Sequence, residues 1–144
     1  MASPDKETFV HRWFEEVWNK GRIEAIDELL AEGAVIHGLK GAMGEEVRGP
    51  EGFRPFFQAF HSAFPDIRIT VETTVSEGNK IAAWCVVRGT HTEDGIGIAP
   101  TQKPIEFTGM CMVVVENGKM VEVWNSFDFL SFYQQLGVLP VLSA

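Results

Sequence analysis

Four polar side chains stand where apolar segments end, and each is of a type that takes part in proton transfer. Asn125 follows residues 120–124, which are apolar except for Glu122, Asp128 comes three positions later, and His37 and His91 each end a largely apolar segment. An imidazole or a carboxylate can accept a proton, and an amide can donate a hydrogen bond to a developing oxyanion. If these groups meet in one apolar cavity, we expect proton abstraction and enolate stabilisation. Asn125 would polarise an oxygen, and His37, His91 or Asp128 would carry the proton.

Each of these residues also has a structural interpretation, and the sequence leaves both open. Asn125 can be an amide that bonds to the backbone, and Asp128 can be the N-cap of a helix that begins there. His91 can bond to the loop that follows it. His61 fits a half-buried helix position as well as a cavity wall.

Aromatic residues supply the expected walls of the cavity. The chain has eleven Phe, four Trp and one Tyr, and a phenyl ring carries no hydrogen-bonding group, so this aromatic mass requires a dry interior. The residues that we expect to contact a ligand are Trp13, Phe14, Phe57, Phe60, His61, Phe64, Phe107, Cys111 and Phe127.

The alternation of side chains along the last predicted strand supports this arrangement. If Asn125 faces inward, then Val121, Val123 and Phe127 face inward too. That set is apolar, as the wall of a cavity would require.

The first half of the chain has the periodicity of helices. Apolar residues recur at helical spacing after Ser3 and Pro4, which suit the start of a helix, and Gly21 and Gly33 end the first two segments. A Phe-rich stripe then ends at Pro65. We expect helices over 3–18, 23–30 and 50–64, with a short strand over 34–37 and a loop over 38–49.

From residue 67 onward the apolar period changes to two, which predicts strands. We expect strands over 67–73, 81–90, 105–115 and 121–127, a hairpin at Asn117 and Gly118, and a terminal helix over 128–137. Helices segregated from antiparallel strands define an α+β domain, here a single one over 1–144. The aromatic stripes need a concave apolar surface. We therefore expect N-terminal helices packed in a strongly curved, mainly antiparallel sheet, forming a cone with an internal pocket.

Composition and charge exclude several classes of partner. The net charge of −8 disfavours nucleic acid and an anionic membrane, because phosphates would repel this surface. No run approaches the roughly 20 apolar residues that span a bilayer, and the polar first residues do not resemble a signal peptide. Cys85 and Cys111 lie in apolar segments, so we expect buried free thiols in a reducing cytoplasm. We find no metal-ligand spacing and no phosphate loop, and we expect no cofactor.

Six short motifs follow one another in an order typical of a known family. They are Gly49-Pro50-Glu51-Gly52-Phe53, Phe64-Pro65-Asp66, Arg88-Gly89-Thr90-His91-Thr92, Pro100-Thr101, Gly118-Lys119 and Gln134-Gln135-Leu136-Gly137. From about Phe9 to Gly137 the chain resembles the SnoaL-like polyketide cyclases (ester cyclases) of the nuclear transport factor 2-like superfamily.

This resemblance implies a cofactor-free enzyme in which a carboxylate at the end of the last strand removes a proton next to a carbonyl. An enolate forms, and an intramolecular aldol addition closes a ring. The position of that carboxylate is Asn125 here, and a familiar histidine position on the late strand is Cys111. An amide cannot act as the base. Either the base has moved, or the reaction differs (isomerisation or dehydration), or the protein only binds.

Two further functions and one assembly stay open from the residues. One function is a non-catalytic protein that binds a small hydrophobic ligand. The other is epoxide hydrolysis, which needs two carboxylates joined by an Arg in the pocket, and Arg88 is predicted to point outward. We also expect a homodimer, because the outer sheet face would carry Trp84, Val86, Met110 and Met112.

Overall fold

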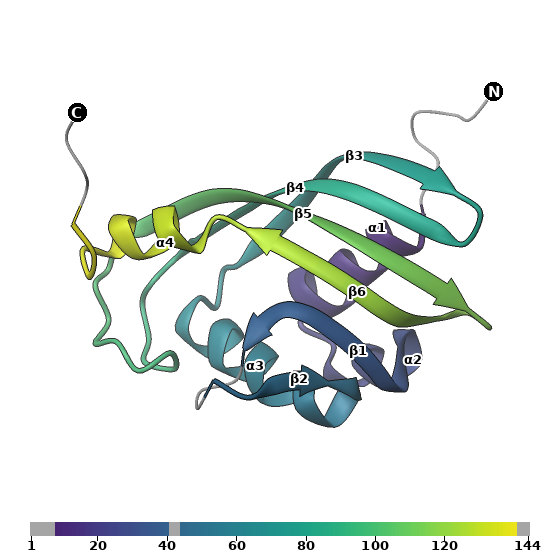
Figure 1. The fold of residues 1–144 in the computed structure, drawn as a ribbon. Helices are drawn as coiled ribbons and strands as arrows, with labels where there is room; N and C mark the ends of the chain where they lie inside the picture. Colours follow the sequence, from purple (N-terminus) through teal and green to yellow (C-terminus); the bar gives the residue numbers. More distant parts are fainter. Residues whose placement is uncertain (1–7, 41–43, 141–144) are drawn as a thin grey trace.

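The computed structural model describes residues 8–40 and 44–140 and shows helices packed against one curved sheet (Figure 1). The described elements in chain order are α1 (Phe9–Trp13), the π-helical turn η1 (Phe14–Asn19), α2 (Ile23–Leu29), β1 (Leu30–Lys40), β2 (Glu46–Arg48), α3 (Gly49–Ala63), β3 (Arg68–Glu77), β4 (Lys80–Thr90), β5 (Pro104–Glu116), β6 (Lys119–Phe127) and α4 (Phe129–Leu136).

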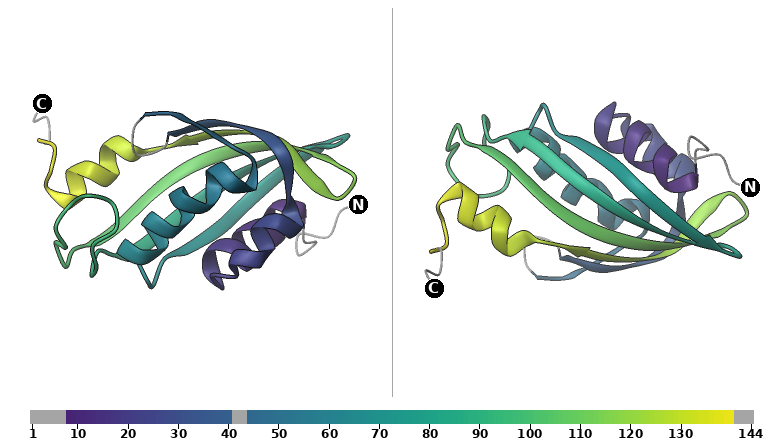
Figure 2. Two further views of the ribbon diagram at one scale, coloured as in Figure 1. Left: turned by 90° about the horizontal axis from the view of Figure 1, so that it is seen from below. Right: turned by 90° about the horizontal axis from the view of Figure 1, so that it is seen from above.

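The six described strands form one open sheet in the order β2-β1-β6-β5-β4-β3. All neighbours are antiparallel except β1 and β6, which run parallel. Figure 2 shows α1 and α3 lying across the concave face, while no described helix covers the convex face. The prediction of an α+β fold with a strongly curved, mainly antiparallel sheet is confirmed.

Several predicted boundaries are wrong in the first half of the chain. The strand expected over 34–37 is the middle of β1, which begins directly after α2, so Gly33 lies inside a strand. The loop expected over 38–49 contains the end of β1 and the short strand β2. Positive φ angles at Gly33 (+73°) and Gly38 (+86°) let β1 bend where its register shifts against β6 and against β2, respectively. The helix start predicted at Ser3 and Pro4 lies outside the described residues.

A β-bulge in β6 changes which of its side chains face the helices. Val114 pairs with Glu122, but Val115 pairs with Met120, so Val121 is an extra residue opposite that register shift. The bulge moves Met120 (2% exposed) to the concave face, where strict alternation would have placed Val121. The prediction that Val121 faces inward is therefore wrong. Bulges also increase local strand twist, which suits a sheet that wraps around helices.

The core is built mainly from phenyl rings. Phe132 on α4 is fully buried, and its ring centre lies 5.3–5.7 Å from those of Phe60, Phe64 and Phe107. On the other side of α3, Phe57 packs against Trp18 at 5.1 Å. Truncating one such ring to alanine typically costs about 3–5 kcal/mol, so α3 and α4 are held mainly by this burial.

Hydrogen bonds fix α4 at the end of the sheet. Asp128 caps its first turn by accepting from the Ser131 N–H at 3.0 Å, and Gly137 ends it at φ +84°. The Gln135 amide accepts from the Glu106 N–H at 2.8 Å and donates to the Glu106 carbonyl at 2.7 Å. This pair of bonds imitates a neighbouring strand and places the residues before and after Asp128 near the start of β5.

We expect Gly38→Ala to destabilise the protein more than Gly33→Ala, although both glycines have positive φ angles in β1. A Cβ at position 38 would clash with the Asn125 carbonyl oxygen, whereas one at position 33 meets open space. Left-handed backbone alone costs about 1–2 kcal/mol, and the clash should raise the loss for Gly38→Ala to about 3 kcal/mol or more. Urea denaturation of both variants measures the difference, and equal losses would contradict the close approach of β1 to β6.

Candidate functional site

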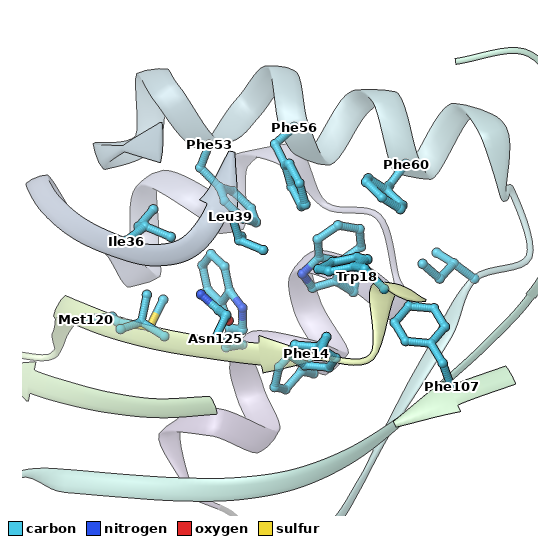
Figure 3. Close-up of a pocket in the computed structure, with 15 residues that line it drawn as sticks. Phe14, Trp18, Ile36, Leu39, Phe53, Phe56, Phe60, Phe107, Met120 and Asn125 are labelled. Carbon is cyan, nitrogen blue, oxygen red and sulfur yellow. The ribbon is translucent and has the colours of Figure 1, made fainter. Parts of the chain in front are cut away.

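A cavity of about 70 Å³ lies between the concave sheet face and the helices (Figure 3). Of the expected ligand contacts, Trp13, Phe14, Phe60, Phe107 and Phe127 line it, and Asn125 lines it as well. Its other walls are Trp18, Ile36, Leu39, Phe53, Phe56, Ile67, Met120, Val123 and Phe129.

Four expected contacts do not line this cavity. Phe57 and Phe64 are buried in the surrounding core, and His61 packs against Phe57 with ring centres 5.2 Å apart. Cys111 is 3% exposed and lies within the sheet core. The spacing of the Phe residues on α3 contained the missed signal: positions 53, 56 and 60 share the face toward the cavity, as i, i+3 and i+7 do on a helix.

Asn125 places an amide in this apolar wall. Its Nδ2 donates to the His37 carbonyl oxygen at 3.0 Å, across the parallel junction of β1 and β6. A carbonyl can only accept, so this bond fixes which end of the amide is nitrogen. Oδ1 and the second Nδ2 hydrogen have no partner among the described residues. One donor and one acceptor therefore stay available to a ligand.

The imidazole of His37 is not in the cavity, contrary to the expectation that it points inward. His37 pairs in register with Trp124, and partners in a parallel pair share a face, which here is the convex one. The two rings stack at 5.1 Å and 17°, and Nε2 lies 2.7 Å from Glu122 Oε2. Only the backbone carbonyl of His37 reaches the site.

The His91 side chain bonds to the loop that follows it and does not line the cavity. Its side chain is completely buried and stacks on Phe64 at 5.2 Å. Nδ1 accepts from the Thr101 N–H at 3.2 Å, which makes the ring neutral with its proton on Nε2. Nε2 has no partner among the described residues. The imidazole therefore anchors the loop between β4 and β5.

Asp128 is exposed and serves as the N-cap of α4, as its structural interpretation required. Its sequence neighbours Phe127 and Phe129 both line the cavity, but its carboxylate is engaged with the helix N-terminus. Of the four residues expected to meet, only Asn125 presents its side chain to the cavity.

The described lining of the cavity thus contains no acidic or basic side chain. The lining residues whose side chains carry a polar N or O atom are Asn125, Trp13 and Trp18. Arg88, the candidate for epoxide hydrolysis, pairs with Glu106 at 2.7 Å and is half exposed. The described walls therefore lack the two carboxylates and the Arg that epoxide hydrolysis requires.

A second, larger hollow of about 790 Å³ adjoins the first. The two share Leu39, Phe56, Phe60 and Phe129, so these four side chains form a constriction between an inner cavity and an outer groove. The groove is more polar, and its lining includes Lys40, Glu45, Glu46 and Tyr133 together with residues 95–97. A ligand longer than the inner cavity would extend through the constriction into this groove.

The two cysteines are free and buried on the adjacent strands β4 and β5. Cys111 is the direct cross-strand partner of Asn125 in the β5–β6 register. Its hydrogen bond with the Cys85 thiol and its burial raise the pKa of the Cys111 thiol. The thiol therefore stays neutral beneath the amide and offers neither a nucleophile nor a base.

None of the described helices is both long enough and apolar enough to cross a membrane. Over residues 8–40 and 44–140, no three His, Cys, Asp or Glu side chains are grouped to hold a metal ion.

Comparison with known proteins defines the family. The family model of SnoaL-like polyketide cyclase matches residues 8–136, which is most of the chain. The chain belongs to this family, and the resemblance drawn from its motifs is confirmed.

Similar solved structures agree with this assignment. The chain is 36% identical to IdmH, described as a proposed polyketide cyclase from Streptomyces antibioticus, over 90% of this chain and 96% of that one, with a TM-score of 0.76. It is 27% identical to a proposed polyketide cyclase from Bacillus cereus ATCC 10987, over 92% and 80% of the two chains, with a TM-score of 0.76. TsrD from Streptomyces laurentii shares the fold at 22% identity, with coverages of 91% and 93% and a TM-score of 0.77. A search of curated proteins found no match.

We expect both thiols to resist alkylation in the folded protein. Burial shields both thiols from the reagent, and the raised pKa of Cys111 keeps that thiol protonated. Alkylation needs the thiolate, so the reaction should be slow. Because the folded state holds this proton more tightly than the unfolded chain does, the stability contribution is lost as the pH rises above the ordinary thiol pKa. Iodoacetamide at pH 8.5 should label the native protein at least about a hundredfold more slowly than the protein in urea. Equal labelling rates would contradict the buried thiol pair.

Proposed function

We propose that the protein is a cofactor-free enzyme that acts on a small, largely apolar carbonyl compound and stabilises its enolate, with Asn125 as the group that contacts the oxygen. The observation that carries this proposal is the position of the Asn125 amide. It is held by the His37 carbonyl at 3.0 Å, retains a free N–H, and stands in a cavity lined mainly by aromatic and aliphatic side chains. The family supports a cyclase or isomerase type of reaction.

The chemistry follows from the difference between a ketone and its enolate. An enolate oxygen carries more negative charge than a carbonyl oxygen, so a fixed N–H donor in an apolar cavity stabilises it more strongly. The proton must leave to an acceptor. Because none of the described lining residues is a base, we assign this role to water or to a second functional group of the substrate. Cyclisation, isomerisation and dehydration all begin with such an enolate.

The two hollows suggest the shape of the substrate. The inner cavity of about 70 Å³ admits only a small part of a molecule, while the groove of about 790 Å³ has the size of an ordinary ligand site. We therefore propose a substrate whose apolar, carbonyl-bearing end passes the constriction and whose remainder lies in the groove.

The alternative function is binding without turnover. It is favoured by one specific observation: the described inner lining has no titratable side chain, although the resemblance to the family implies a carboxylate at the position of Asn125. Under this alternative the amide would only orient the ligand. Two buried free thiols fit a reducing compartment such as the cytoplasm under either function.

Replacement of Asn125 by leucine should abolish most of the activity while the cavity stays apolar. We expect the α-protons of ethyl benzoylacetate to exchange with deuterium faster in the presence of the wild type, as measured by proton NMR. Loss of an oxyanion donor typically costs about 10²–10³ in rate, so Asn125→Leu should lower the enzymatic exchange roughly a hundredfold. Asn79→Leu, at an exposed turn position, is the matched control.

The outcomes separate the two functions. Exchange that is unchanged in Asn125→Leu would remove this amide from the mechanism. Binding of ethyl benzoylacetate can be followed as quenching of the tryptophan fluorescence of the wild type. If the ester binds but its exchange is not accelerated, the binding alternative gains support.

We also propose that the protein forms a homodimer through the convex sheet face. Trp84, Met110, Met112 and Trp124 are 37–45% exposed there on three adjacent strands, whereas Val86 is buried within the chain. In Figure 2 no described helix covers this face. A continuous apolar patch of this kind usually marks an interaction site.

Light scattering after size exclusion tests this assembly. The wild type should have twice the mass of one 16.0 kDa chain at micromolar concentration, and Trp84→Glu should be a monomer because it buries a charge in the interface. Leu130→Glu, at an exposed position on α4, should leave the dimer intact. A monomeric wild type would contradict the proposal.

A further inference from the structure

The first helical segment changes its hydrogen-bonding period where it borders the cavity. α1 ends at Trp13, and η1 continues as a π-helical turn, with the Lys20 N–H bonding to the Glu15 carbonyl at 2.8 Å. Trp13 and Trp18 are five residues apart, which in an α-helix would separate their directions by about 140°. A π-turn closes five residues later and brings such a pair toward the same side. Both indoles consequently line the cavity.

The side chain of Asn19 holds the end of this turn against the sheet. Its Oδ1 accepts from the Ile69 N–H at 2.7 Å, and its Nδ2 donates to the Ile69 carbonyl at 2.9 Å. Nδ2 also donates to Glu15 Oε1 at 3.0 Å. The amide thus replaces a missing strand at the edge of β3 and fixes the turn that carries Trp18.

The two indole N–H groups have no protein partner among the described residues. Buried tryptophans usually find an acceptor for this group, yet Trp13 and Trp18 are each 6% exposed and neither donates a hydrogen bond. Neither indole nitrogen is among the fully buried polar atoms without a partner, whereas Nε2 of His91 is. Figure 3 shows the Trp18 ring inside the cavity, beneath Phe56 and Phe60, with its nitrogen on the side nearer to Asn125 in this view.

We propose that the N–H groups of Trp13 and Trp18, together with the free N–H of Asn125, form the donor set that binds the oxygen atoms of the ligand. Three neutral donors, with no charged described side chain in the lining, suit an uncharged ligand with two nearby acceptor oxygens. A 1,3-dicarbonyl compound or its enol has this pattern, and its enolate gains most from the donors. Asn19 is the positioning residue that keeps Trp18 in place.

This inference deepens the proposed function of the same cavity and rests on it. It adds ligand contacts that were not expected to donate hydrogen bonds. It also narrows the ligand to a molecule that offers acceptors rather than donors or a negative charge.

The four tryptophans of the chain provide an internal comparison. Trp13 and Trp18 lie in the cavity, whereas Trp84 and Trp124 lie on the convex face and are 40% and 38% exposed. Protein labelled with ¹⁵N at the indole nitrogens is titrated with acetophenone, and with ethylbenzene as a probe of the same shape without the oxygen. Each resonance is assigned from the four single Trp→Phe variants.

Acetophenone has a single oxygen with two lone pairs, so compared with ethylbenzene we expect it to shift at least one of the inner two indole protons downfield and to leave the outer two unmoved. Trp18→Phe removes the donor and keeps most of the ring, so it should weaken acetophenone binding about three- to tenfold and ethylbenzene binding little, as loss of one hydrogen bond predicts. Trp84→Phe and Trp124→Phe should change neither affinity. Asn19→Ala should shift the Trp18 resonance and reduce the preference for the ketone.

Different failures point to different parts of the account. Equal shifts and equal affinities for the two probes would overturn the donor set but leave a hydrophobic cavity that binds ligands. If acetophenone binds and shifts the Asn125 side-chain amide but neither inner indole, the donors are confined to Asn125 and the inference is overturned. If neither probe binds the wild type, the proposed function falls and the inference falls with it.

Discussion

The candidate site depends on the junction at which β1 runs parallel to β6. Gly38 has no side chain, so the backbone of β1 comes close enough for the His37 carbonyl to accept from the Asn125 amide. This bond fixes the orientation of the amide and satisfies half of its donors. The remaining N–H can then face the apolar cavity at a smaller desolvation cost than an amide with no partner would incur.

The rest of the fold surrounds this amide with an apolar wall, in which a charged group would be destabilised by the loss of its hydration. Phenyl rings from α3 and α4 and the indoles of the π-turn leave a small hollow in which neutral donors are the polar groups of the described lining. A low-dielectric cavity strengthens each donor toward a growing negative charge on oxygen. It also disfavours an ionised base, which agrees with an amide at Asn125 and a neutral thiol at Cys111. The larger outer groove leaves room for a substrate of greater length.

Periodicity and motif order predicted the architecture, because the helical stripes, the Asn117-Gly118 hairpin and the Asp128 cap are local signals. They did not predict the direction of His37, since its face depends on pairing with Trp124 in a strand 87 positions away. The bulge at Val121 and the π-turn at Phe14–Asn19 follow from tertiary contacts that no spacing rule encodes. His91 has the second of its two predicted roles, because Thr101 in the loop that follows it supplies its hydrogen-bond partner. Asn125 was predictable because a polar residue interrupts an apolar strand face.

The central claim is that a ligand carbonyl accepts a hydrogen bond from Asn125 inside a dry cavity. Isotope-edited infrared spectroscopy of acetophenone labelled with ¹³C at its carbonyl tests this directly. The account predicts that the bound carbonyl band lies at a lower wavenumber than in hexane, and that Asn125→Leu moves it back toward the hexane position. A hexane-like band in the wild type, with the ketone demonstrably bound, would contradict the account.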